Sequence, residues 1–134
     1  MPACSTAGRL LRLGKHPMTL RKSDKRREAC RAEIQLAAQA LSEGNYDKAF
    51  CHAERAHVLG QPWPGHHTAT HWLMFKIGLA RKDGREVFGQ LVRLAAGGLL
   101  TFLGRLPEGN TGGANVPPEK PMPLPPDLQK LCEP

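Results

Sequence analysis

The sequence has few aromatic residues, no long uninterrupted apolar run and no closely spaced cysteines. Phe, Trp and Tyr make up 5% of the 134 residues, and they are not interleaved with basic residues as in proteins that stack nucleic-acid bases. The longest apolar run, residues 94–103, is split by Gly97 and Gly98 and is much shorter than the roughly 20 residues that a membrane span requires. We therefore expect neither base stacking nor a membrane span.

The four cysteines form no CxxC pair, and the first twenty residues lack the apolar stretch of an export signal because Arg9, Arg12 and Lys15 interrupt it. Free thiols are typical of reducing compartments, so we expect a cytoplasmic protein. The four cysteines are Cys4, Cys30, Cys51 and Cys132.

Acidic residues are scarce near the N-terminus. Residues 1–27 contain eight basic side chains and Asp24 alone as an acid, so this stretch accounts for the whole net charge of +7. A basic arm can hold polyanions by counterion release, but no nucleic-acid-reading motif accompanies it. We expect residues 1–22 to be a disordered leader, with Met18 an alternative start, and we do not expect nucleic-acid binding.

Alternating apolar and polar residues, which would indicate strands, are also absent, whereas apolar residues recur at helical spacing. The sequence predicts an all-α fold with four helices over residues 23–43, 45–60, 64–82 and 83–98, and a further short turn over 99–103. The expected N-terminal caps are Ser23, Asn45 and Asp83. The expected stops are Gly44, Gly60 and the pair Gly97 and Gly98.

Proline and glycine are concentrated after residue 106, where eight of the twelve prolines lie. We therefore divide the chain into the leader, a helical domain over 23–106 and an arm over 107–134. The arm is expected to contain no helix and to lie extended over the domain, packed through Met122, Leu124 and Leu128. Its glycine-rich segment, residues 109–115, is interpreted as a structural turn.

The first two predicted helices resemble a tetratricopeptide repeat, whose small and aromatic positions they match over one unit of 34 residues. A second unit fits poorly, because Gly89 and Arg93 fall where the repeat has other residue types. The resemblance implies helical hairpins with a groove for a protein partner. The matching residues are Leu36, Ala37, Ala40, Gly44, Tyr46, Ala49, Ala56, Leu59 and Pro62.

Five of the six histidines lie between residues 52 and 71. In an antiparallel hairpin of the second and third helices, His57 lies opposite His67 and His52 opposite His71. His67 and His71 are four residues apart and share a helix face, whereas His52 is turned about 140° from His57. The pattern predicts a metal site made by His57, His67 and His71, with His52 at its rim and His66 on another face.

Three imidazoles with an open position suit zinc, and Met74 on the same stripe would favour copper(I). Glu54 is a weaker alternative ligand. The same histidines are also compatible with a purely structural, hydrogen-bonded core. A zinc-peptidase motif is excluded because Thr68, Ala69 and Thr70 provide no glutamate between His67 and His71.

Two segments, AHVLGQ at residues 56–61 and GNTGGANV at residues 109–116, resemble a family of small bacterial proteins described as a domain of unknown function. The resemblance extends from about Arg26 to Leu131 and implies no activity or cofactor. Since no acid, base and nucleophile set can be assembled, we expect a noncatalytic protein-interaction module. The alternative is a protein that binds or handles zinc or copper through its histidines.

Overall fold

The computed structural model describes residues 21–102 and 107–133, with only the backbone described for 97–102, so the expected leader and Cys4 lie outside the described residues. Within this part the chain forms five helices and no strand, which confirms the all-α class. None of these helices is long and apolar enough to cross a membrane. The helices are α1 (Lys22–Ser42), α2 (Tyr46–Gly60), α3 (Pro64–Arg81), α4 (Gly84–Phe102) and α5 (Pro126–Cys132).

Local sequence signals set two of the helix starts as predicted. The Asn45 side chain accepts a hydrogen bond from the Lys48 amide, and Asp83 Oδ1 accepts one from the Glu86 amide at 3.1 Å. The prediction for Ser23 was wrong, because α1 begins at Lys22 after Arg21 and has no side-chain cap. An uncapped start is tolerated where the first amides meet solvent.

The predicted stop at Gly97 and Gly98 was also wrong, since α4 continues to Phe102. Glycine lowers helix propensity by about 1 kcal/mol, which weakens a helix without ending it. A glycine ends a helix when its backbone turns left-handed, as Gly44 does after α1 with a φ of 74°. Gly97 and Gly98 keep helical backbone.

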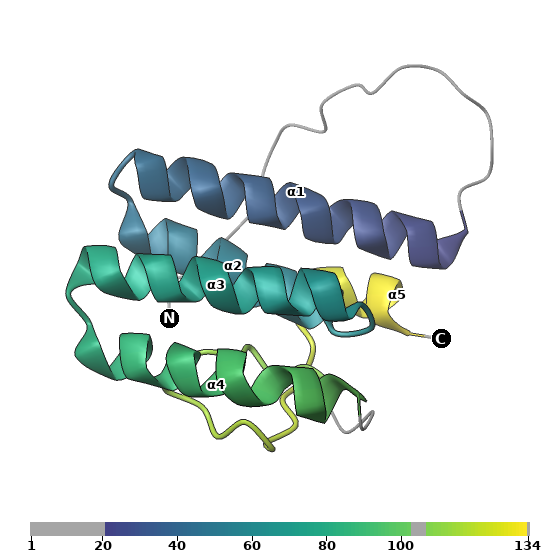
Figure 1. The fold of residues 1–134 in the computed structure, drawn as a ribbon. Coiled ribbons are helices and arrows are strands. Elements are labelled where there is room, and N and C mark those ends of the chain that lie inside the picture. Colours follow the sequence, from purple (N-terminus) through teal and green to yellow (C-terminus); the bar gives the residue numbers. More distant parts are fainter. Residues whose placement is uncertain (1–20, 103–106, 134) are drawn as a thin grey trace.

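The first four helices run up and down in sequence, and α3 lies between α1 and α4 (Figure 1). Contacts join α1 to α2, α2 to α3 and α3 to α4, whereas α1 and α4 do not touch in the described part of the chain. Alanines line the contact of α1 with α2, so the two helices approach closely. The central core consists of Ala37, Ala40, Ala49, Ala53, Leu73, Met74 and Ile77.

The arm departs from the prediction in one respect. Residues 107–125 contain no helix, but the chain then forms α5, which packs on α1 and α2 (Figure 1). Pro126 occupies the first turn of α5, where a proline's missing N–H costs nothing and its fixed φ favours the helix. Leu128 is buried with Cys30 and Leu59 in a second apolar cluster.

Candidate metal centre

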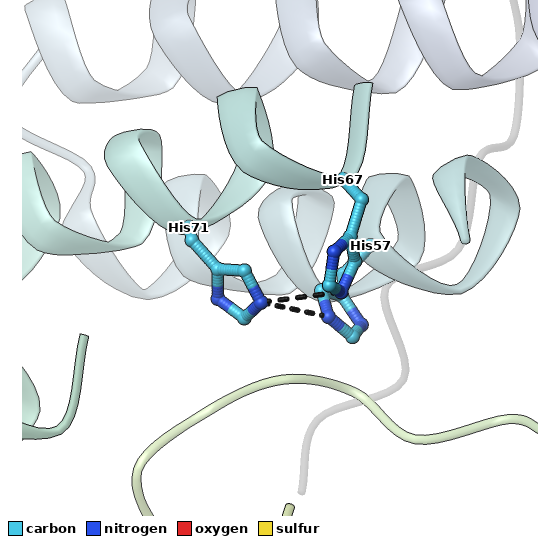
Figure 2. A group of neighbouring side chains, drawn as sticks. All are labelled: His57, His67 and His71. Carbon is cyan, nitrogen blue, oxygen red and sulfur yellow. Dashed lines mark hydrogen bonds between the residues drawn. The ribbon is translucent and has the colours of Figure 1, made fainter. Parts of the chain in front are cut away.

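Three histidines from two helices meet beneath the arm. His57 comes from α2, and His67 and His71 come from successive turns of α3, which returns along α2 after a short connection (Figure 2). One nitrogen from each ring lies within 4.8 Å of the other two. Each residue is only 3–4% exposed. The trio defined by the hairpin register is therefore brought together in the folded chain.

The facing atoms are the Nε2 nitrogens. His71 Nε2 lies 3.2 Å from His57 Nε2 and 3.2 Å from His67 Nε2, the two contacts drawn in Figure 2. Zinc binds imidazole nitrogen at about 2.0–2.1 Å, so two ligand nitrogens of a tetrahedral site are about 3.3 Å apart. The two distances from His71 Nε2 match that between adjacent ligands around a single zinc ion, and all three nitrogens lie within 4.8 Å of one another.

The tautomer of His57 is fixed by the backbone of the arm. His57 Nδ1 lies 2.8 Å from the carbonyl oxygen of Asn110. A carbonyl oxygen only accepts hydrogen bonds, so Nδ1 must carry the proton. In the neutral ring this leaves the Nε2 lone pair facing His71.

The tautomer of His71 is fixed by Gln90 on α4. The Gln90 amide nitrogen donates to Glu86 Oε1 at 2.6 Å and to the Gly112 carbonyl at 2.9 Å, which orients the amide group. Its oxygen therefore faces His71 Nδ1 at 2.7 Å and accepts a hydrogen bond from the Nδ1–H group. His71 Nε2 therefore also carries a lone pair, so in the neutral trio no hydrogen lies between His71 Nε2 and His57 Nε2.

Burial keeps these rings neutral. Removal from water lowers the pKa of His67 and of His71 to about 4, and it lowers the pKa of His57 well below its usual value, with the neighbouring rings adding to the effect. Neutral imidazole is the form that binds metal ions. The trio thus presents unprotonated nitrogens at neutral pH.

The glycine-rich segment of the arm closes over His57. Gly112 has a φ of 79°, and a Cβ built there would lie 2.6 Å from the His57 ring, so both the backbone angle and the close approach require glycine. Asn110 holds the segment in shape, since its side chain donates to the carbonyls of Pro117 and Lys120 and accepts from the Gly112 amide. The motif is a turn, as expected, and it also supports the histidine site.

His52, predicted at the rim, lies outside this group. Its Nδ1 is 2.7 Å from Glu33 Oε2, and Glu33 Oε1 accepts from Arg55 at 2.7 Å. His52 therefore belongs to an ion-pair cluster between α1 and α2, and it does not face His71 as the hairpin register predicted. Its position, 140° around α2 from His57, accounts for the difference.

The other residues considered as ligands or neighbours of the site also lie outside the histidine trio. Glu54 is hydrogen-bonded to the Thr111 side chain and does not belong to the group formed by the three histidines. The Met74 sulfur accepts from the Gln90 amide at 3.4 Å. His66 lies beside Trp63 with ring centroids 5.9 Å apart.

The polar residues behind the histidines were not predicted from the sequence. Glu86 is only 6% exposed, and Gln90 is fully buried. Their spacing of four residues on an otherwise apolar helix was the available signal, because polar side chains on a buried stripe need partners. Asn110 carried no such signal, since its contact with His57 spans 53 positions of sequence.

Searches of curated proteins and of solved structures found no significant match. The model of the DUF3703 family, described as proteins of unknown function, matches residues 24–132. This range takes in α2 to α5, all but the first two residues of α1, the three histidines and the glycine-rich segment. It also covers nearly the same residues as the resemblance noted from the sequence. The chain therefore belongs to the DUF3703 family.

Proposed function

We propose that this protein binds one divalent transition-metal ion, zinc in the first instance, through Nε2 of His57, His67 and His71. The observation that carries the proposal is the pair of Nε2 lone pairs of His57 and His71, 3.2 Å apart with both Nδ1 protons committed elsewhere. Two facing lone pairs repel each other unless a cation lies between them. Three neutral ligands leave a fourth position for water or an anion.

A purely structural role for the trio is less well supported. Buried histidines that only hydrogen-bond to one another need a donor opposite each acceptor. His67 can donate to His71, but His57 cannot, because the Asn110 carbonyl takes its proton. The arm therefore enforces in His57 the tautomer that suits a metal ligand, and a hydrogen-bonded trio would form only if His71 gave up its hydrogen bond to Gln90.

The chemistry of the ligands favours zinc over copper(I). Three imidazoles suit zinc and the neighbouring borderline divalent ions, whereas copper(I) prefers sulfur. The sulfur of Met74 is used as an acceptor for the Gln90 amide, which argues against its serving as a ligand. Outer partners of the kind seen for His57 and His71 are typical of metal-bound histidines.

The proposal is tested by metal titration of the untagged, metal-free protein. We expect one equivalent of Co²⁺ to give the visible absorption of a tetrahedral site, and Zn²⁺ to displace it. His67→Ala/His71→Ala should bind zinc at least about 100-fold more weakly. His66→Ala is the matched control, since it removes a neighbouring imidazole outside the trio, and it should bind like the wild type. Equal binding by wild type and double variant would refute the proposal.

A second candidate function is a noncatalytic protein-interaction module, and the exposed apolar side chains of α3 and α4 favour it. Phe88 is 70% exposed and lines a surface groove with Val92 and Pro117. The resemblance of the α1 and α2 sequences to a tetratricopeptide repeat would suit such a role. The other exposed large apolar residues on these two helices are Trp72, Leu79 and Leu91.

This second proposal predicts a partner whose capture depends on α4 and not on the histidines. A protein recovered from cell extract with the wild type should be lost with Phe88→Ser/Val92→Ser and kept with His67→Ala/His71→Ala. Equal recovery of the partner with and without the α4 substitutions would count against this proposal.

We further propose a cytoplasmic location, which is supported by Cys30, Cys51 and Cys132 forming no disulfide with one another.

A further inference from the structure

The outer partners of the histidine trio converge on one segment of the arm, residues 107–118, which we name the docking segment. His57 donates directly to the Asn110 carbonyl. His71 reaches the same segment through Gln90, whose amide nitrogen donates to the Gly112 carbonyl. Two ligands of the proposed metal site are therefore held, one directly and one through an intermediary, by carbonyls two residues apart.

Gln90 has no freedom to rearrange without losing partners. Its oxygen accepts from His71, and its nitrogen donates to Glu86 and Gly112. Turning the amide over would place its oxygen against two other oxygens, the Glu86 carboxylate and the Gly112 carbonyl. The orientation of Gln90 is thus tied at once to the tautomer of His71 and to the position of the docking segment.

In the metal-free trio, the repulsion between the His57 and His71 lone pairs is relieved if His71 moves its proton to Nε2. His71 Nδ1 would then be an acceptor facing the Gln90 oxygen, and the contact would break. A metal ion on Nε2 removes this alternative, because it forces the proton to Nδ1. Metal binding therefore selects the one state in which all of the Gln90 hydrogen bonds form.

Other contacts hold the docking segment without involving the histidines. Glu86 Oε2 accepts from the Ala114 amide at 3.0 Å, and Arg93 donates to the Val116 carbonyl at 2.7 Å. Gln61 donates to the Pro107 carbonyl at 2.8 Å. The docking segment is therefore partly held in both the metal-free and the metal-bound protein, and the metal changes how firmly it is held.

We propose that Gln90 is a positioning residue that couples metal occupancy of the histidine trio to the docking of residues 107–118. The inference rests on the proposed metal-binding function and gives it a regulatory consequence. Metal binding would change how firmly the docking segment is held against the helices. Coupling of this kind is reciprocal, so a firmly docked segment also tightens metal binding.

The coupling is tested by hydrogen exchange on the full chain, with and without saturating zinc. In the wild type, zinc should slow exchange of the docking-segment amides at least about tenfold, with a smaller change in the first half of α1. Gln90→Leu should bind zinc more weakly and, once saturated, show little of this slowing. Gln61→Leu is the matched control, because it removes an amide contact to the same segment away from the histidines, and it should keep the full zinc effect.

A second variant separates positioning from packing. Gln90→Glu keeps an acceptor for His71 but loses the donor to Gly112, so it should retain zinc binding while losing the slowing of exchange. Imidazole nitrogen chemical shifts give an independent readout. In zinc-bound wild type, His71 should carry its proton on Nδ1, and metal-free Gln90→Leu should show a tautomer mixture shifted from the metal-free wild type.

The outcomes distinguish the inference from the function on which it rests. Stoichiometric zinc binding without any slowing of exchange in residues 107–118 overturns the coupling and leaves the metal site standing. A full zinc effect in both Gln90 variants assigns the coupling to other residues and overturns the role of Gln90. Absence of zinc binding in the wild type removes the proposed function itself.

Discussion

The three buried or half-buried glutamates of the helices differ in how their charge is compensated. Glu33 accepts from His52 and Arg55, and Glu86 accepts from the Gln90 amide and the Ala114 backbone. Glu54 has a hydrogen bond to Thr111, yet burial outweighs it and raises the pKa of Glu54 to about 7, with Glu86 adding to the rise. Ionisation of Glu54 therefore costs free energy in the folded state.

This imbalance predicts how stability depends on pH. The pKa of Glu54 is higher in the folded chain than in the unfolded chain, so its penalty is absent below about pH 4 and complete above about pH 7. We expect Glu54→Gln to stabilise the metal-free protein at pH 8 by about 1–3 kcal/mol, and by much less at pH 5. Urea unfolding at the two pH values measures the difference. An equal effect at both would show that the charge of Glu54 is not responsible.

At the scale of elements, the parts that the sequence predicts well are those with local signals. Asn45, Asp83 and Pro64 mark helix starts within a few residues of the helices they begin, and the hairpin register places His57 near α3. Helix α5 was missed because the prolines of the arm were taken to exclude a helix, whereas Pro126 occupies the first turn, where proline is accepted. The docking segment forms through contacts distant in sequence, which no local pattern encodes.

The docking segment provides an element-scale prediction at Gly112. Gly44 and Gly112 both have positive φ, but a Cβ at Gly44 meets nothing within 4 Å, whereas one at Gly112 would overlap His57. We expect Gly44→Ala to cost about 1 kcal/mol of stability and to leave zinc affinity unchanged. Gly112→Ala should cost more and weaken zinc binding at least about tenfold, because His57 must move. Matching effects of the two substitutions on zinc affinity would contradict this account.

At the scale of the whole molecule, the proposed metal site lies where four parts of the fold meet. Its ligands come from α2 and α3, their outer partners come from α4 and the arm, and α1 and α4 do not touch in the described residues. The histidine trio could be predicted from the sequence because the register of a helical hairpin and the phase of residues around each helix depend only on the spacing of residues along the chain. It could not predict Gln90, whose role depends on how α4 and the arm pack on that hairpin.

A metal ion at this junction should stabilise the whole fold. At free zinc about 100 times its dissociation constant, binding contributes about 2.7 kcal/mol, which corresponds to a rise in Tm of about 10 °C for a domain of this size. We expect a chelator to reverse the rise and His67→Ala/His71→Ala to show none of it. Thermal unfolding followed by circular dichroism measures the change in Tm, with His66→Ala as the control. An unchanged Tm in the wild type would speak against a site within the folded core.

The near-complete burial of the three histidines under the glycine-rich turn has a kinetic consequence. An ion held there cannot be reached by a competing chelator until the turn lifts, so its release would be governed by an internal opening step and not by the strength of the competitor. Such a protein would hold its ion through brief shortages of free metal. It would give the ion up on a timescale set by its own arm.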